Sequence, residues 1–302
     1  MERITPWPFG SRGSIGSAAF GSPSTSAGAG KEIPTPTWTR PTWRGSTSTR
    51  TAFGPRRSGP GGGSGPMAGE VGPALWERAL ALQKAQVRSW PALARGHEAL
   101  REALWREWKI DGWTVKAQCN QARAASNKAK VDPRAVQERP CFLCAENRPS
   151  EQEALEWGEE WWILANPAPL FSHHFTVTLK RHGREHILGK LDAFLRLARD
   201  LSPGLSVFYN GPRSGASAPD HFHFQAYTAG SLPIEEEAMG PEGPGRGVLA
   251  RAASGGASAA VVEAAGRAFL LVRGEAFDRI LSVLRNSIAR LGGESGNEDP
   301  WA

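Results

Sequence analysis

The sequence is poor in cysteine and has no long hydrophobic run. Its 302 residues include three cysteines, Cys119, Cys141 and Cys144. An odd number of cysteines with one close pair is not typical of a secreted disulfide framework and favours a reducing, cytoplasmic setting. Because no stretch approaches the roughly 20 consecutive apolar residues of a membrane span, we expect no membrane partner.

Acidic side chains are scarce in residues 1–66, which carry the whole net charge of +6 and leave the remainder neutral. A neutral remainder argues against nucleic acid as a partner. The segment is rich in Gly, Ser, Pro and Thr without apolar periodicity, so we expect a disordered basic tail. It also lacks an apolar run of about 7–15 residues, which argues against a secretory signal. A transit peptide and a mis-assigned start, with synthesis beginning at Met67, both remain open.

Hydrophobic periodicity predicts an α+β fold for residues 67–230. Helical spacing extends from 74 to 109, with a break at Trp90–Pro91 because proline cannot continue a helix interior. A second helix is predicted at 190–201. Alternating patterns predict strands at 113–119, 160–165, 175–179, 205–209 and 219–225. Short connections between sequential strands imply an antiparallel sheet with helices packed on one face.

The remaining segments are predicted with less regular structure. The polar stretch 120–139 is expected to be a loop, and Cys119, just before it, a small buried residue. A linker rich in Gly, Pro and Glu is predicted at 231–253. In residues 254–302 we expect a short strand at 268–272 and an amphipathic helix. This last segment is too small to bury a core alone, so it must pack on the main domain or on a partner.

The most informative motif is Pro219-Asp220-His221-Phe222-His223-Phe224-Gln225. On a strand the two histidines and the glutamine share one face, and the phenylalanines can anchor the other face in a core. Imidazole at this spacing offers a neutral nucleophile or a metal ligand near neutral pH. A pair of purely structural histidines is the alternative.

Cys141-x-x-Cys144 can hold a tetrahedral metal ion, and zinc is the usual ion with thiolate and imidazole ligands. The same motif also serves redox chemistry. The absence of a second C-x-x-C excludes a Cys₄ site, so a zinc site needs two histidines. Six candidates follow in the chain: His173, His174, His182, His186, His221 and His223.

The loop before the histidine motif, residues 210–218, is rich in glycine and small residues. Such a loop allows backbone N–H groups to approach a phosphate, and Arg213 adds a guanidinium that can bind two phosphate oxygens. An ordinary hairpin loop is the alternative. Two further cations, Arg123 and Lys128, are plausible phosphate contacts by their position in the chain.

Together these motifs resemble the histidine-triad superfamily. The residues that carry the resemblance are Asn210-Gly211, Gly215, Ser217, His221-Phe222-His223-Phe224-Gln225, Arg139–Pro149 and Asn166–His182. The closest likeness is to the transferase branch, in which the last motif position is Gln. That branch contains galactose-1-phosphate uridylyltransferase, diadenosine tetraphosphate phosphorylase and GDP-galactose phosphorylase. Residues 75–230 as a whole also resemble an uncharacterised bacterial domain family of this superfamily.

The resemblance implies a role for each motif residue. His223 would be the nucleophile that attacks the α-phosphorus of a nucleotide, and Gln225 would bind an oxygen of the covalent nucleotidyl-histidine. A structural zinc ion would be held by Cys141, Cys144, His182 and His221. Phosphates and ribose would contact Asn210, Gly211, Arg213, Gly215 and Ser217.

The resemblance therefore implies a nucleotidyltransferase or nucleotide phosphorylase with a histidine-triad (HIT-like) fold. The nucleotide would come from a dinucleoside polyphosphate or a nucleotide-sugar and pass to inorganic phosphate or a sugar phosphate. Phe222 replaces the proline of the uridylyltransferase motif, which favours the phosphorylases. Residues 254–302 would be a shortened second copy of the fold, and a homodimer is expected by analogy. A nucleotide hydrolase and a non-catalytic nucleotide-binding module are the alternatives.

Overall fold

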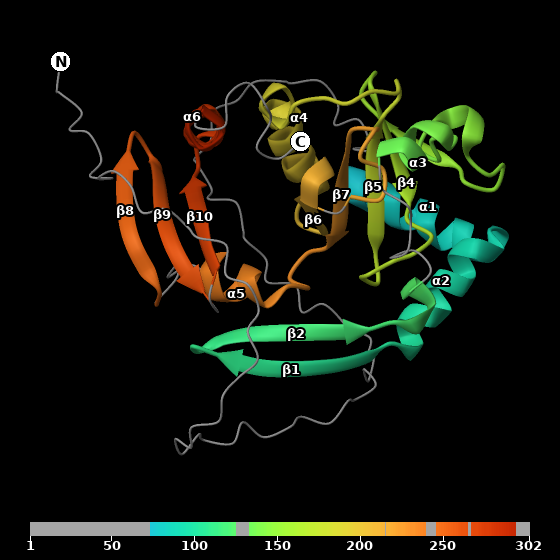
Figure 1. Cartoon of the computed structure of the whole chain (residues 1–302), viewed down its shortest axis with the longest axis horizontal. Helices are drawn as coiled ribbons and strands as arrows, with labels where there is room; N and C mark the ends of the chain where they lie inside the picture. The colour runs from blue at the N-terminus through green and yellow to red at the C-terminus, as the bar shows by residue number, and fades with distance from the viewer. Residues whose placement is uncertain (1–72, 125–132, 215, 240–245, 265–266, 294–302) are drawn as a thin grey trace, which may run out of the picture. The chain divides into compact units, whose positions relative to one another are not determined.

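The computed structural model describes residues 73–124, 133–214, 216–239, 246–264 and 267–293 (Figure 1). These residues form helices and antiparallel sheets, so the predicted α+β class is confirmed. The basic tail predicted at 1–66 lies outside them. Within the described ranges, no helix is both long enough and apolar enough to cross a membrane.

The central sheet contains five antiparallel strands in the order β3-β4-β5-β7-β6. They are β3 (Ala154–Trp157), β4 (Trp161–Ala165), β5 (His174–Leu179), β6 (Leu205–Phe208) and β7 (His223–Thr228). The sequence predicted four of these five strands and missed β3. β7 lies between β5 and β6 and pairs with both. It begins at His223, four residues after the start of the predicted strand at 219–225, so His221 lies outside the strand and does not share its face with His223 and Gln225.

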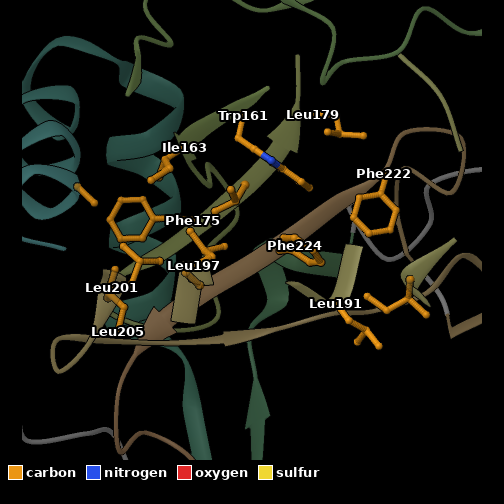
Figure 2. Close-up of a cluster of buried hydrophobic side chains, with 14 residues drawn as sticks. Trp161, Ile163, Phe175, Leu179, Leu191, Leu197, Leu201, Leu205, Phe222 and Phe224 are labelled. Carbon is orange, nitrogen blue, oxygen red and sulfur yellow. The ribbon is translucent and has the colours of Figure 1, made fainter. Parts of the chain in front are cut away.

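One face of this sheet forms the hydrophobic core with helices α1 (Leu75–Ser89) and α4 (Ile187–Leu201). Figure 2 shows the centre of this core, where Phe224 stacks on Trp161 at 5.0 Å between ring centroids. Phe222 and Phe224 both belong to the core, as the alternating motif predicted. Each such burial stabilises the fold by about 1.5–3 kcal/mol. The opposite face of β7 is therefore free to carry His223 and Gln225.

The first turn of α4 explains why this helix begins three residues before its predicted start. His186 lies at the N-cap, and its Nδ1 accepts a hydrogen bond of 3.1 Å from the backbone N–H of Leu188. The cap satisfies a donor that a helix start leaves without a partner. Four leucine or isoleucine side chains of α4 are buried, including Leu197 and Leu201.

The predicted long N-terminal helix is correct only in its first part. The break at Trp90–Pro91 is confirmed, but α2 (Pro91–Glu102) ends before a strand, β1 (Leu104–Ile110). β1 pairs with β2 (Trp113–Cys119) through a turn in which Asp111 and Gly112 both have positive φ. Asp-Gly favours this two-residue hairpin turn, so the hairpin replaces the predicted end of the helix.

Two smaller predictions near β2 were wrong. Cys119 is exposed because it lies at the last position of β2, away from the core clusters. The predicted loop at 120–139 contains a short 3₁₀ helix, Gln121–Ala124, and the helix α3 (Pro133–Glu138). Residues 125–132 lie outside the described ranges.

The C-terminal part contains more structure than predicted. The linker at 231–253 contains the helix α5 (Pro233–Met239) and most of β8 (Val248–Ser254). β8, β9 (Ala257–Ala264) and β10 (Arg267–Gly274) form a separate antiparallel sheet, followed by α6 (Phe277–Gly293). Leu281, Leu284 and Ile288 of α6 pack against the core of the main domain, as expected of a segment too small to fold alone. Its origin as a second copy of the fold stays a prediction.

Candidate functional site

Four side chains form a cluster that could bind a metal ion. Their ligand atoms all lie within 4.8 Å of one another and belong to Cys141, Cys144, His182 and His221. The cysteines lie in a turn, His182 follows β5 and His221 precedes β7. Because β5 and β7 are antiparallel neighbours, the end of one and the start of the other meet at one edge of the sheet. The predicted set of metal ligands is therefore brought together by the fold.

The distances within the cluster suit a tetrahedral ion. Cys141 Sγ lies 3.3 Å from Nδ1 of His221, and Cys144 Sγ lies 3.3 Å from Nδ1 of His182 and 3.6 Å from Nδ1 of His221. Zinc bonds of about 2.3 Å to sulfur and 2.0 Å to nitrogen, at tetrahedral angles, place S and N ligands about 3.5 Å apart. Four protein ligands leave no position for a substrate, so the arrangement fits a structural ion.

A hydrogen bond behind the ring holds His221 in the orientation that a metal needs, and a carboxylate lies near the outer nitrogen of His182. Nε2 of His221 lies 2.9 Å from the carbonyl oxygen of Leu179, which can only accept, so Nδ1 is free of its proton toward the cluster. Nε2 of His182 lies 3.9 Å from Oδ2 of Asp220, and that carboxylate pairs with Arg139 at 3.2 Å. Such carbonyl and carboxylate partners orient histidine ligands in metal sites.

Burial, together with the neighbouring Cys141, raises the pKa of Cys144 to about 12. In the absence of a cation the Cys144 thiol therefore stays protonated at neutral pH. A bound metal ion would supply the positive charge that favours the thiolates. The buried cysteine pair thus fits a soft cation better than a reactive thiol.

His223 offers a neutral nitrogen on the opposite side of β7 from the core. Burial lowers its pKa, and its Nδ1 donates a hydrogen bond of 2.8 Å to the carbonyl oxygen of His221. This contact fixes the tautomer, so the lone pair is on Nε2. Among the described residues, none forms a hydrogen bond with Nε2. His221 itself lies just before β7 with its ring turned to the cysteines, and Gln225 shares the face of His223.

A small cavity of about 50 Å³ lies beside His223. It is lined by Arg184, Glu185, Tyr209, Asn210, Pro212, Ala216, Ala218, Pro219, His221, Phe222 and His223. Its size suits a phosphoryl group rather than a whole ligand, since sites for small molecules are usually roughly 300–1,000 Å³. His223, the candidate nucleophile, and residues of the loop at 210–218 therefore line the same cavity.

The predicted phosphate contacts differ in how the structure places them. Asn210 lines the cavity, and Gly211 lies next to it. Ser217 is exposed, and its carbonyl oxygen accepts a hydrogen bond from Arg139. Gly215, Lys128 and the side chain of Arg213 lie outside the described parts of the chain. Their role as substrate contacts stays a prediction.

Arg123 lies away from the small cavity. Its guanidinium donates a hydrogen bond to the carbonyl oxygen of Ala168, and it is not among the residues that line the space beside His223. Its charge does act on His174 of β5, whose pKa it helps to lower. A contact between Arg123 and the substrate stays a prediction.

Sequence reasoning missed Arg184. This exposed side chain lines the cavity beside His223 and also a larger cavity of about 650 Å³ next to the metal cluster. Within the described ranges it forms no hydrogen bond or ion pair, unlike Arg181, which pairs with Glu185. The only signal in the sequence was its position two residues after His182.

His174 is the second residue whose place the sequence did not predict. It is 1 % exposed on β5, and burial lowers its pKa to about 4 from 6.5. Between about pH 6.5 and pH 4 the unfolded chain therefore binds a proton there that the folded protein does not. Stability must rise with pH through this window and fall as acid is added.

We expect His174→Gln to remove this part of the pH dependence. Urea unfolding at pH 7 and near pH 4 should show that the wild type loses about 3 kcal/mol more stability than the variant over this range. All other histidines are present in both proteins, so the difference isolates residue 174. Equal losses in the two proteins would mean that His174 titrates normally.

The comparisons with known proteins assign no activity. The searches of curated proteins and of solved structures found no match. Residues 82–228 match the model of a protein family described as a domain of unknown function, DUF4922. The matched segment falls inside the predicted domain at 67–230 and contains the metal cluster, the loop at 210–218 and all of β7.

Proposed function

We propose that this protein is a nucleotidyltransferase of the histidine-triad type that works through a covalent nucleotidyl-His223 intermediate. The proposal rests on the imidazole of His223. The ring is neutral, and its Nδ1–H donates a hydrogen bond to a carbonyl oxygen. Its Nε2 forms no hydrogen bond within the described ranges, and the ring lines a cavity of about the size of a phosphoryl group. An imidazole held in this way is prepared to attack phosphorus.

The reaction would take place in two displacements. Nε2 of His223 forms a bond to the α-phosphorus, and the bond from phosphorus to the leaving group breaks, which releases a nucleoside polyphosphate from a dinucleoside polyphosphate or a sugar phosphate from a nucleotide-sugar. An oxygen of the acceptor then attacks the same phosphorus, and the P–N bond breaks. With inorganic phosphate as acceptor, the product is a nucleoside diphosphate. Throughout, the Nδ1–H of His223 stays bound to the carbonyl oxygen of His221, which stabilises the cationic imidazole of the intermediate.

Gln225 supports transfer rather than hydrolysis. Its side chain shares the face of His223, and an amide can donate a hydrogen bond to a phosphoryl oxygen without carrying charge. An uncharged amide supplies neither a general acid nor a general base for water. We therefore favour phosphate or a sugar phosphate as the acceptor over water.

We assign zinc to the cluster of Cys141, Cys144, His182 and His221, on the basis of its two sulfur and two nitrogen atoms and their spacing. With all four positions taken by the protein, the ion would brace the start of β7 and take no part in the transfer. The side chain of His221 would bind the ion, and its backbone carbonyl oxygen accepts the hydrogen bond from His223. The ion would therefore help to fix the position of the His223 ring.

Turnover measurements test the proposal. The purified protein is incubated with nucleotide-sugars and dinucleoside polyphosphates, each with and without inorganic phosphate. We expect nucleoside diphosphate to form only when phosphate is present. Equal rates of nucleoside monophosphate release with and without phosphate would instead identify a hydrolase. Binding without turnover of any member would contradict an enzymatic function.

We expect Arg184→Gln to weaken binding of the phosphate-bearing substrate. A guanidinium at the mouth of the cavity can bind phosphate oxygens, and its loss should raise KM by about tenfold or more with a smaller effect on kcat. Steady-state kinetics at constant ionic strength provide the measurement. Arg95→Gln is the matched control, because Arg95 is exposed on α2. Equal effects of both substitutions would show that only overall charge matters.

A further inference from the structure

Gln225 and His174 form a hydrogen-bonded pair across β7 and β5. Nε2 of His174 lies 2.9 Å from Oε1 of Gln225, although the two residues are 51 positions apart in the chain. On the other side of the ring, the backbone N–H of Leu170 donates a hydrogen bond of 3.2 Å to Nδ1 of His174. A backbone N–H can only donate, so Nδ1 is the acceptor. The ring proton must therefore be on Nε2, which donates to Gln225.

The ring of His174 is also fixed in its plane. Phe171 contacts it edge to face, with ring centroids 5.7 Å apart, and Phe208 stacks on it at 6.4 Å. His174 is almost fully buried and stays neutral at physiological pH, because its pKa lies near 4. The donor presented to Gln225 is therefore rigid and uncharged.

This contact decides which end of the Gln225 amide is left free on the face of β7 that carries His223. A glutamine amide can turn by about 180°, which exchanges a donor for an acceptor. With Oε1 bound to His174, the NH₂ group is left free, and in the described part of the chain nothing accepts a hydrogen bond from it. An amide turned the other way would present an oxygen, which would repel the phosphoryl oxygens.

We propose that His174 is a positioning residue, which holds the Gln225 amide with its NH₂ group available to the phosphoryl group on His223. This inference rests on the proposed function and adds the reason why a neutral amide in this place acts as a donor. The donor would bind a phosphoryl oxygen whose charge grows during transfer, so its orientation should affect kcat more than KM.

Two substitutions separate positioning from simple packing. Glutamine places its amide nitrogen near the position of Nε2 and can still donate to Gln225. Asparagine places its amide near Nδ1, so it can accept from Leu170 but does not reach Gln225. We expect His174→Gln to keep kcat within about threefold of wild type, and His174→Asn to lower kcat by about ten- to a hundredfold with little change in KM. The reverse order would contradict the inference.

A double-mutant cycle closes the test. In a Gln225→Ala background, His174→Asn should cause little further loss, since no amide remains to be oriented. An equal loss in both backgrounds would show that His174 acts through general structure and would overturn the inference.

The behaviour of the wild-type protein distinguishes failure of the positioning role from failure of the proposed function. If it forms no nucleotide adduct with any substrate, the proposed function fails. If it forms the adduct and His174→Asn transfers as fast, only the positioning role fails. ¹⁵N NMR of the histidine rings gives a readout without substrate, in which His174 should carry its proton on Nε2 between pH 6 and 8. A proton on Nδ1 would contradict the inference.

Discussion

His223→Ala is expected to form no covalent nucleotide adduct and to lose transfer activity by about 10⁴-fold or more, because the substitution removes the attacking nitrogen. No other described imidazole can replace it at this position. His221 is turned to the cysteines with its Nε2 against a carbonyl oxygen, and His174 is held between Leu170 and Gln225. Intact mass and steady-state rates give the measurement.

The loss must be separated from misfolding. His223 lines a cavity and is not part of the hydrophobic core, so the variant should unfold at nearly the same urea concentration as the wild type. His186→Asn is the matched control, since His186 is exposed at the N-cap of α4 and asparagine is a good N-cap residue. Wild-type turnover by a well-folded His223→Ala variant would exclude the covalent mechanism.

The second large effect concerns the metal cluster. Cys144→Ser is expected to lower the bound zinc from one ion per chain to a small fraction of that value, because it removes one of four ligands and the hydroxyl group stays protonated. Loss of the ion should reduce the free energy of unfolding by about 5 kcal/mol or more, since zinc binding to structural sites is worth about 10 kcal/mol or more. His221→Ala should have a similar effect and also remove activity.

Elemental analysis and urea unfolding measure both parts of this prediction. Cys119→Ser is the matched control, because Cys119 is exposed at the end of β2 and outside the cluster. It should keep both the zinc and the stability of the wild type. Full zinc content in Cys144→Ser, or a different metal in the wild-type protein, would contradict the assignment.

Local patterns in the sequence predicted a helix or strand correctly where one face of that element is strongly apolar. The alternation of Phe222 and Phe224 with polar residues predicted β7, and the apolar stripe of residues 190–201 predicted α4. β1 was missed because Leu100 and Leu104 continue the spacing of a helix, although Asp111–Gly112 favours a hairpin turn after this segment. In β8 and β9, alanine and serine give little contrast between the two faces.

The sequence predicted those residues of the candidate site that belong to short motifs. The spacing of Cys141 and Cys144 indicates a metal site. The choice of His182 as a further ligand came from the resemblance to the histidine-triad superfamily. The contact of His174 with Gln225 and the place of Arg184 depend on the register of β5 with β7 and on the path of a loop. No local pattern encodes such long-range geometry.

The proposed mechanism requires that one imidazole nitrogen, Nε2 of His223, carries the nucleotide between the two displacements. Intact mass of the protein mixed with nucleotide-sugars or dinucleoside polyphosphates in the absence of phosphate, followed by fragmentation, tests it most directly. We predict one nucleoside monophosphate on His223, stable to base and labile to acid, that disappears as nucleoside diphosphate forms when phosphate is added. An adduct on any other residue, or turnover without any adduct, would contradict this account.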